Sequence, residues 1–134
     1  MVIKATRQLS RGLRSGVQGT SRDSTSRAFS ALLKAGRKTY VFPAFPLETV
    51  KDPTGAGDTF AGGFMGYLTS CGGFSDVAQL KRAMLYGTVM ASYTVQEFST
   101  KALEDLTRAR IDDRFEDLVE RLSIPVDPVL IAAN

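Results

Sequence analysis

One short segment constrains this chain more than any other. Residues 52–60 read DPTGAGDTF, and a run with the apolar spacing of a helix follows. The two glycines allow backbone conformations that turn successive N–H groups toward one point. The first N–H groups of a helix lack partners inside the helix, and the helix dipole adds positive potential there. The segment therefore predicts a site for phosphate or another anion. It is not a P-loop, because no lysine follows Gly57.

Asp58 is the unusual member of this segment. Its carboxylate would repel an arriving phosphate, so packing gives no reason for its presence. Beside a transferred phosphate, an aspartate can accept the proton of an attacking hydroxyl while N–H groups stabilise the phosphoryl charge. The alternative is that Asp58 only caps the helix, and the spacing leaves both interpretations open. Histidine catalysis and histidine metal sites are excluded, since the chain has no histidine.

The helix expected after this turn is unusually rich in glycine. It should run from Asp58 or Thr59 to about residue 69, with Gly62, Gly63 and Gly66 inside it. Each glycine costs up to about 1 kcal/mol relative to alanine. Gly62 and Gly66 share one face of the helix. Such glycines indicate close approach of a ligand or of another backbone, so a nucleotide lying across the helix and tight packing are both open.

The rest of the body indicates one strand and further helices. Residues 39–45 have the composition of a strand, with Pro43 at its edge or end. A second helix should begin with Ser75 as its N-cap and continue to about Tyr93. Residues 102–121 indicate one or two amphipathic helices whose charged face is solvated and carries i,i+4 pairs.

Charge divides the chain into two unlike parts. Residues 1–38 hold nine basic residues and one acid, whereas residues 39–134 hold eight basic residues and thirteen acids. The first part also has few large apolar side chains, so it cannot offset the entropy of becoming ordered. We therefore expect a disordered basic arm at 1–38, a folded domain at 39–122 and an irregular tail at 123–134.

Three interpretations of the basic arm stay open. It can be a solvated tail, an organellar transit peptide or an arm that binds nucleic acid. Nucleic-acid binding is the weakest of the three, because no aromatic residue precedes Phe29. The single cysteine, Cys71, cannot form an internal disulfide, and no apolar run is long enough to span a membrane. We expect a cytoplasmic protein, or an organellar one if the arm is a transit peptide.

A family resemblance rests on these same residues. Residues 50–66, VKDPTGAGDTFAGGFMG, closely resemble the C-terminal signature of the ribokinase/PfkB carbohydrate kinase family, usually written D-T-x-G-A-G-D. Pro53 stands where threonine is more usual. A weaker resemblance continues to about Phe115, and TYVFPAFPLETV before the signature resembles the family's preceding strand. The resemblance implies an α/β fold, namely the C-terminal part of a ribokinase-like three-layer α/β/α domain.

The resemblance also implies an activity and a set of site residues. The activity is ATP-dependent phosphorylation of a sugar or nucleoside hydroxyl, with ATP bound as its Mg²⁺ complex. Asp58 takes the role of general base. The anion hole for the γ-phosphate is implied at Gly55, Ala56 and Gly57. Asp52 and the Thr54 carbonyl match ligands of a monovalent cation such as K⁺, and no other metal ligand is assigned.

The chain also departs from the family pattern. The family's sugar-binding residues, lid strands and N-x-x-E magnesium motif have no counterpart in this sequence. A second hypothesis is therefore a truncated, non-catalytic fragment with at most residual phosphate or nucleotide binding. A homodimer or a complementing chain could supply what is missing. The acceptor cannot be named, because the residues that would bind its hydroxyls are absent.

Overall fold

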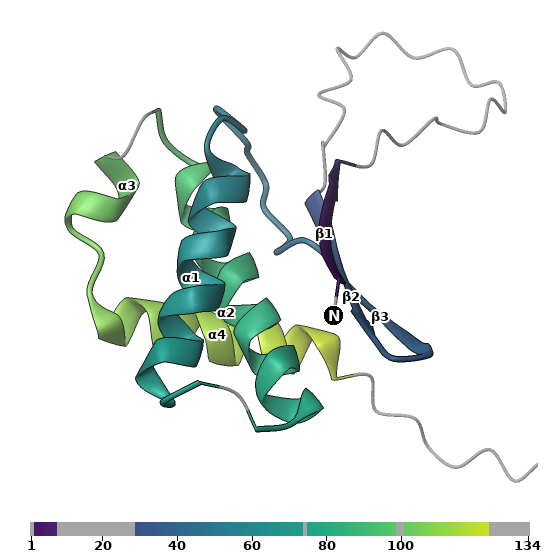
Figure 1. Ribbon diagram of the computed structural model, residues 1–134. Coiled ribbons are helices and arrows are strands. Elements are labelled where there is room, and N and C mark those ends of the chain that lie inside the picture. The colour runs from purple at the N-terminus through teal and green to yellow at the C-terminus, as the bar shows by residue number, and fades with distance from the viewer. Residues whose placement is uncertain (1, 8–28, 74, 99–100, 124–134) are drawn as a thin grey trace, which may run out of the picture.

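The computed structural model describes residues 2–7, 29–73, 75–98 and 101–123, and these ranges form a mixed α/β structure. The predicted fold class is confirmed at that level. Within these ranges the elements are β1 (Val2–Arg7), β2 (Phe29–Ala35), β3 (Lys38–Phe42), α1 (Ala56–Ser70), α2 (Val77–Thr94), α3 (Lys101–Glu104) and α4 (Arg108–Leu122). Among these elements, the helices lie to one side of the sheet (Figure 1).

The sheet is antiparallel with the order β1-β2-β3. The register places Leu33 of β2 opposite Ile3 of β1 and opposite Tyr40 of β3. Gly36 makes the turn between β2 and β3 with φ 61°, a conformation that glycine adopts without a steric penalty. Alternate residues of β2, Ala31 and Leu33, are buried against the helices. Alternation of this kind is what a half-buried strand requires.

The prediction that the basic arm is disordered is wrong at residues 29–38. These residues form β2 and the turn into β3. The physical reason is local. The apolar residues that alternate along β2 become buried, which stabilises the strand, and the average composition of the whole arm does not reveal this alternation. Residues 2–7 also form a strand paired with β2. Residues 8–28 of the arm, and the expected tail beyond Ser123, lie outside the described residues.

Two helices, α1 and α2, pack side by side and form the core with the sheet. Apolar side chains from both helices meet β2 and β3 in one buried cluster: Ala31, Leu33, Phe42, Phe60, Phe64, Leu68, Leu80, Ala83 and Met84. A second cluster joins α2 to α4 through Val89, Tyr93 and Leu118. The first cluster therefore packs α1 against α2 and the sheet, and the second packs α4 against the C-terminal half of α2.

The helix termini differ from the predictions by a few residues. Helix α1 begins at Ala56, two positions before the expected start. It ends at Ser70, one residue beyond the expected 69, and its C-cap Cys71 is followed by Gly72 and Gly73, both with positive φ. In α2 the N-cap is Asp76 rather than Ser75, and its carboxylate accepts from the Gln79 N–H at 2.8 Å. Residues 102–121 resolve into two helices, α3 and α4.

Close approach between α1 and α2 explains one of the three helical glycines. A Cβ at Gly63 would lie 2.7 Å from Met90 Cγ and 3.0 Å from the Tyr86 carbonyl oxygen. A Cβ at Gly62 or Gly66 would have no neighbouring atom within 4 Å among the described residues. The tight packing therefore lies on the Gly63 side of α1, and a nucleotide across the Gly62 face stays a prediction. Within the described ranges, no helix is both long and apolar enough to span a bilayer.

Candidate functional site

The predicted anion-binding segment is a tight turn that leads into α1. Gly55 is the N-cap, with φ 80° and ψ −4°, in the left-handed region that favours glycine. Before it, the Thr54 N–H donates to Asp52 Oδ1 at 2.9 Å, which closes a small side-chain turn around Pro53. Proline fixes its own φ, so this part of the turn is restricted before any ligand arrives.

Several backbone N–H groups of this turn find no acceptor in the part of the chain that the structure describes. Among the described residues, none accepts a hydrogen bond from the N–H of Gly55, Gly57 or Asp58. The Ala56 N–H donates to the Pro53 carbonyl, although at a long 3.4 Å. The structure thus brings Gly55, Ala56 and Gly57 together at the N-terminus of α1, with the amides of both glycines open to a ligand. Free amides at a helix N-terminus favour a bound anion.

Asp58 lies in the first turn of α1 with its side chain exposed. It makes no hydrogen bond or ion pair with any residue that the structure describes. The interpretation of Asp58 as the helix cap is wrong, because Gly55 holds that position and no side chain caps the helix. The carboxylate is therefore available beside the open amides.

The end of α2 holds the turn in place. The Val95 carbonyl accepts from the Lys51 N–H at 2.8 Å and from the Asp52 N–H at 3.3 Å. Lys51 Nζ also pairs with Glu97 Oε2 at 2.8 Å. Deeper in the structure, Thr94 Oγ1 donates to Thr59 Oγ1 at 2.9 Å and so joins α2 to the first turn of α1. These contacts fix the turn from both of its ends.

A cavity of about 590 Å³ opens next to the turn. Ala56 and Gly57 line one part of it, and the loop of residues 43–50 lines another. Residues of α2 and its C-cap form a third wall: Thr88, Ala91, Ser92 and Val95. None of these four residues was assigned to a site from the sequence, although their i, i+3, i+4, i+7 spacing on one helix face was a usable signal. The walls are mostly apolar, and Glu48 and Arg121 are the charged residues among them.

Comparison with known proteins identifies the family. The model of the pfkB family carbohydrate kinases matches residues 26–106, more than half of the chain. The chain belongs to the pfkB family of carbohydrate kinases. The matched part of this pfkB chain includes the turn, α1, α2 and the β2–β3 hairpin. A search of curated proteins found no match.

In this pfkB chain the two expected cation ligands lie on the same turn. Hydrogen bonding to Thr54, through its side chain first and its backbone second, holds the pKa of Asp52 below the ordinary 3.8. Asp52 is therefore ionised at neutral pH. The Thr54 carbonyl accepts no hydrogen bond from the described residues. Both oxygens are chemically suited to a hard cation. Elsewhere in the described ranges, no three Asp, Glu, Cys or His side chains gather closely enough to hold a metal ion.

Proposed function

We propose that this chain provides the phosphate-binding turn and the catalytic base of an ATP-dependent kinase that phosphorylates a sugar or nucleoside hydroxyl. One observation carries the proposal. An exposed carboxylate, Asp58, lies in the first turn of α1 together with the open amide of Gly57, and the open amide of Gly55 is at the N-cap of the same helix. Membership of the pfkB family of carbohydrate kinases supports the same chemistry.

The proposed reaction is an in-line transfer of the γ-phosphoryl group. Asp58 accepts the proton of the acceptor hydroxyl as the hydroxyl oxygen attacks the γ-phosphorus. A new P–O bond forms, the bond to the β-phosphate oxygen breaks, and ADP leaves with that electron pair. The amides of Gly55 and Gly57 donate to the γ-phosphoryl oxygens and stabilise their charge. Mg²⁺, when bound to the phosphates, neutralises further charge.

The cavity beside the turn suits the rest of the nucleotide. Its volume of about 590 Å³ falls in the range of roughly 300–1,000 Å³ found for small-molecule sites. Because its walls are mostly apolar, they favour a planar base, while the polar phosphates reach the turn at Gly57. In this proposal, Asp52 and the Thr54 carbonyl hold a K⁺ ion that stabilises the turn.

The first experiment replaces the proposed base. Asp58→Asn should lower the rate of ADP formation by roughly 10²–10⁴-fold or more, because general-base catalysis is lost. Affinity for MgATP, measured by calorimetry, should change little, since the amides of the turn remain. The matched control is Asp105→Asn, an exposed aspartate after α3 for which no ion pair with a described residue is found. It should behave as wild type in both measurements. Near-normal turnover in Asp58→Asn would contradict the assignment of the base.

The same assay separates catalysis from binding alone. The wild-type chain is offered MgATP with a panel of sugars and nucleosides. ADP formation that depends on an acceptor supports the kinase. MgATP binding without ADP formation supports the second hypothesis, a chain that binds nucleotide without catalysis.

A further inference from the structure

Arg114 of α4 reaches across to the last turn of α2. Its Nη1 donates to Ser92 Oγ at 3.0 Å and to Gln96 Oε1 at 2.8 Å. Its guanidinium carbon lies 3.5 Å from the centroid of the Tyr93 ring, a close cation–π contact. One side chain therefore binds three residues at the end of α2.

The environment of Arg114 differs from that of the other arginines on α4. Arg108 and Arg121 are mostly exposed and pair with aspartates one helical turn away. Arg114 is partly buried and makes no ion pair with any described residue. Burial lowers its pKa, and the cost of removing a cation from water must be offset by its specific contacts. A side chain needed only to cover apolar surface would not require the two hydrogen bonds to α2.

The residues that Arg114 binds lie close in sequence to Val95, whose carbonyl holds the proposed phosphate-binding turn. Ser92 and Gln96 lie on either side of Val95 in the sequence, and the Val95 carbonyl accepts the N–H groups of Lys51 and Asp52. Displacement of this last turn of α2 would move both hydrogen bonds. Arg114 of α4 thus contacts the end of α2 directly, and the end of α2 contacts the turn directly through Val95.

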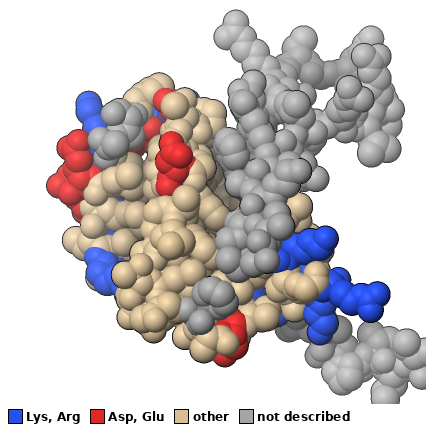
Figure 2. All heavy atoms as spheres, in the orientation of Figure 1, with Lys and Arg blue, Asp and Glu red and all other residues tan. Residues whose placement is uncertain are grey.

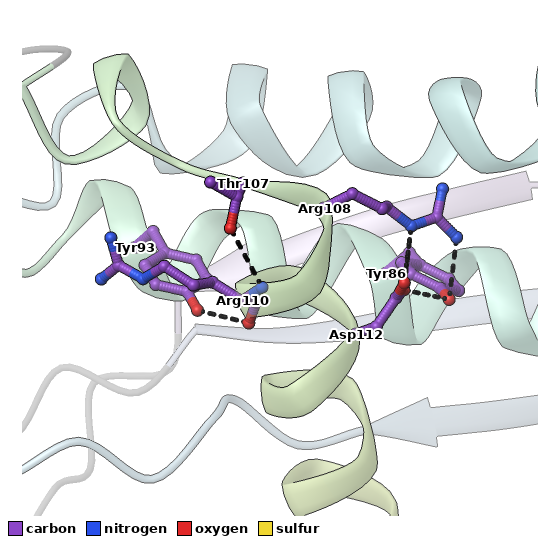
Figure 3. A network of polar contacts seen from close by, with 6 residues as sticks. All are labelled: Tyr86, Tyr93, Thr107, Arg108, Arg110 and Asp112. Atoms are coloured by element: carbon purple, nitrogen blue, oxygen red, sulfur yellow. Dashed lines mark hydrogen bonds and ion pairs between the residues drawn. The ribbon is translucent and has the colours of Figure 1, made fainter.

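We propose that Arg114 is a positioning residue that fixes the end of α2 so that the Val95 carbonyl holds the turn of residues 52–58 ready for phosphate. This inference rests on the proposed function. It assigns to α4 a part in the site, although the family match ends at residue 106. Arg110 provides a contrast, since its guanidinium carbon is 5.8 Å from the same Tyr93 ring. Only its backbone oxygen, which no substitution removes, hydrogen-bonds to α2 among the described residues (Figure 3).

The test compares Arg114→Gln with Arg110→Gln in the full chain. Amide hydrogen exchange is measured by NMR at Lys51 and Asp52, and MgATP affinity is measured by calorimetry. In Arg114→Gln both amides should exchange at least about tenfold faster, and MgATP should bind roughly tenfold more weakly, because hydrogen bonds from a charged group are lost. Arg114→Lys, which keeps the charge and one donor group, should recover part of both effects. Arg110→Gln should match wild type.

Two results would overturn the proposal. One is unchanged exchange at Lys51 and Asp52 in Arg114→Gln. The other is equal acceleration throughout α1 and α2, which indicates a general structural role. If Arg114→Gln does not fold, Gln96→Met removes one acceptor with little change in shape and is judged by the same exchange comparison. If the wild type does not bind MgATP, the proposed function fails, while the exchange comparison still decides the role of Arg114.

Discussion

Asp58 shows what spacing can and cannot determine about a single residue. The sequence placed a carboxylate at the start of a helix, which is compatible with both a cap and a base. The choice depends on where the helix begins, and α1 begins at Ala56 rather than at 58. That earlier start follows from the left-handed conformation of Gly55, a backbone property that the residue type permits but does not dictate. The structure thus excludes Asp58 as the N-cap of α1, while its role as the catalytic base stays a prediction.

Tyr86 gives a residue-level prediction that depends on pH. Its hydroxyl donates to Asp112 Oδ1 at 3.0 Å, beside Arg108 (Figure 3). Burial and the neighbouring Asp112 raise the pKa of Tyr86 above its ordinary 10.0. The folded state therefore holds the phenolic proton more tightly, so this contribution to stability is complete below pH 10 and is lost as the pH rises further.

Tyr86→Phe should accordingly have two effects on the free energy of unfolding. At neutral pH it should lower that free energy by about 1 kcal/mol, the value of a partly exposed hydrogen bond. Above the ordinary pKa of 10.0 the difference from wild type should shrink, because wild type loses the contribution there as well. Urea unfolding at both pH values measures this. A difference that is constant or grows with pH would show that the raised pKa is not linked to folding.

At the scale of elements, the packing of α1 on α2 was only partly predictable. The sequence indicated a glycine-rich helix with close approach on one face. Spacing defines which glycines share a face but not which face meets a neighbour, and the structure selects Gly63 over the Gly62–Gly66 pair. The partner glycine on α2, Gly87, meets Phe60. Both positions lie in the matched family segment.

Gly87→Ala and Gly66→Ala should change stability in opposite directions. A Cβ at Gly87 would lie 2.8 Å from the Phe60 carbonyl oxygen, a backbone atom that cannot move alone. We expect a loss of about 1–3 kcal/mol from overpacking. Gly66 faces open space, so its replacement should raise the free energy of unfolding by up to about 1 kcal/mol through helix propensity. Urea unfolding of the two variants measures both values, and a shared sign would contradict the described packing.

The sheet was the least predictable set of elements. Only residues 39–45 were expected to form a strand, and β3 ends at Phe42, before Pro43. Strands β1 and β2 lie in a segment whose average composition indicates disorder. They form because β2 pairs with both neighbours and buries Ala31 and Leu33. The pairing of β1 with β2 joins residues far apart in sequence and leaves little local signal, unlike the caps and glycines that mark the helices.

At the scale of the whole molecule, the division of charge along the sequence is also visible in space. Figure 2 shows a group of basic side chains on the side of the β2–β3 hairpin, and many of the acidic ones, with some basic ones, on the opposite side near α3. Lys34, Arg37 and Lys38, counted in the sequence as part of the arm, belong to this folded hairpin. The basic character therefore belongs in part to the folded body.

The turn of residues 52–58, which we propose binds phosphate, brings the three scales together. Its Gly55 and Gly57 amides have no acceptor among the described residues, the end of α2 accepts hydrogen bonds from Lys51 and Asp52, and the turn lies inside the segment that the family model matches. The most direct test is an NMR titration of the isotope-labelled full chain with MgATP, inorganic tripolyphosphate and adenosine. We predict that MgATP and tripolyphosphate shift the amide signals of Gly55, Gly57 and Asp58, and that adenosine leaves these three unchanged. Shifts confined to other residues, or no shift with MgATP in the folded chain, would contradict the assignment of this turn as the phosphate site.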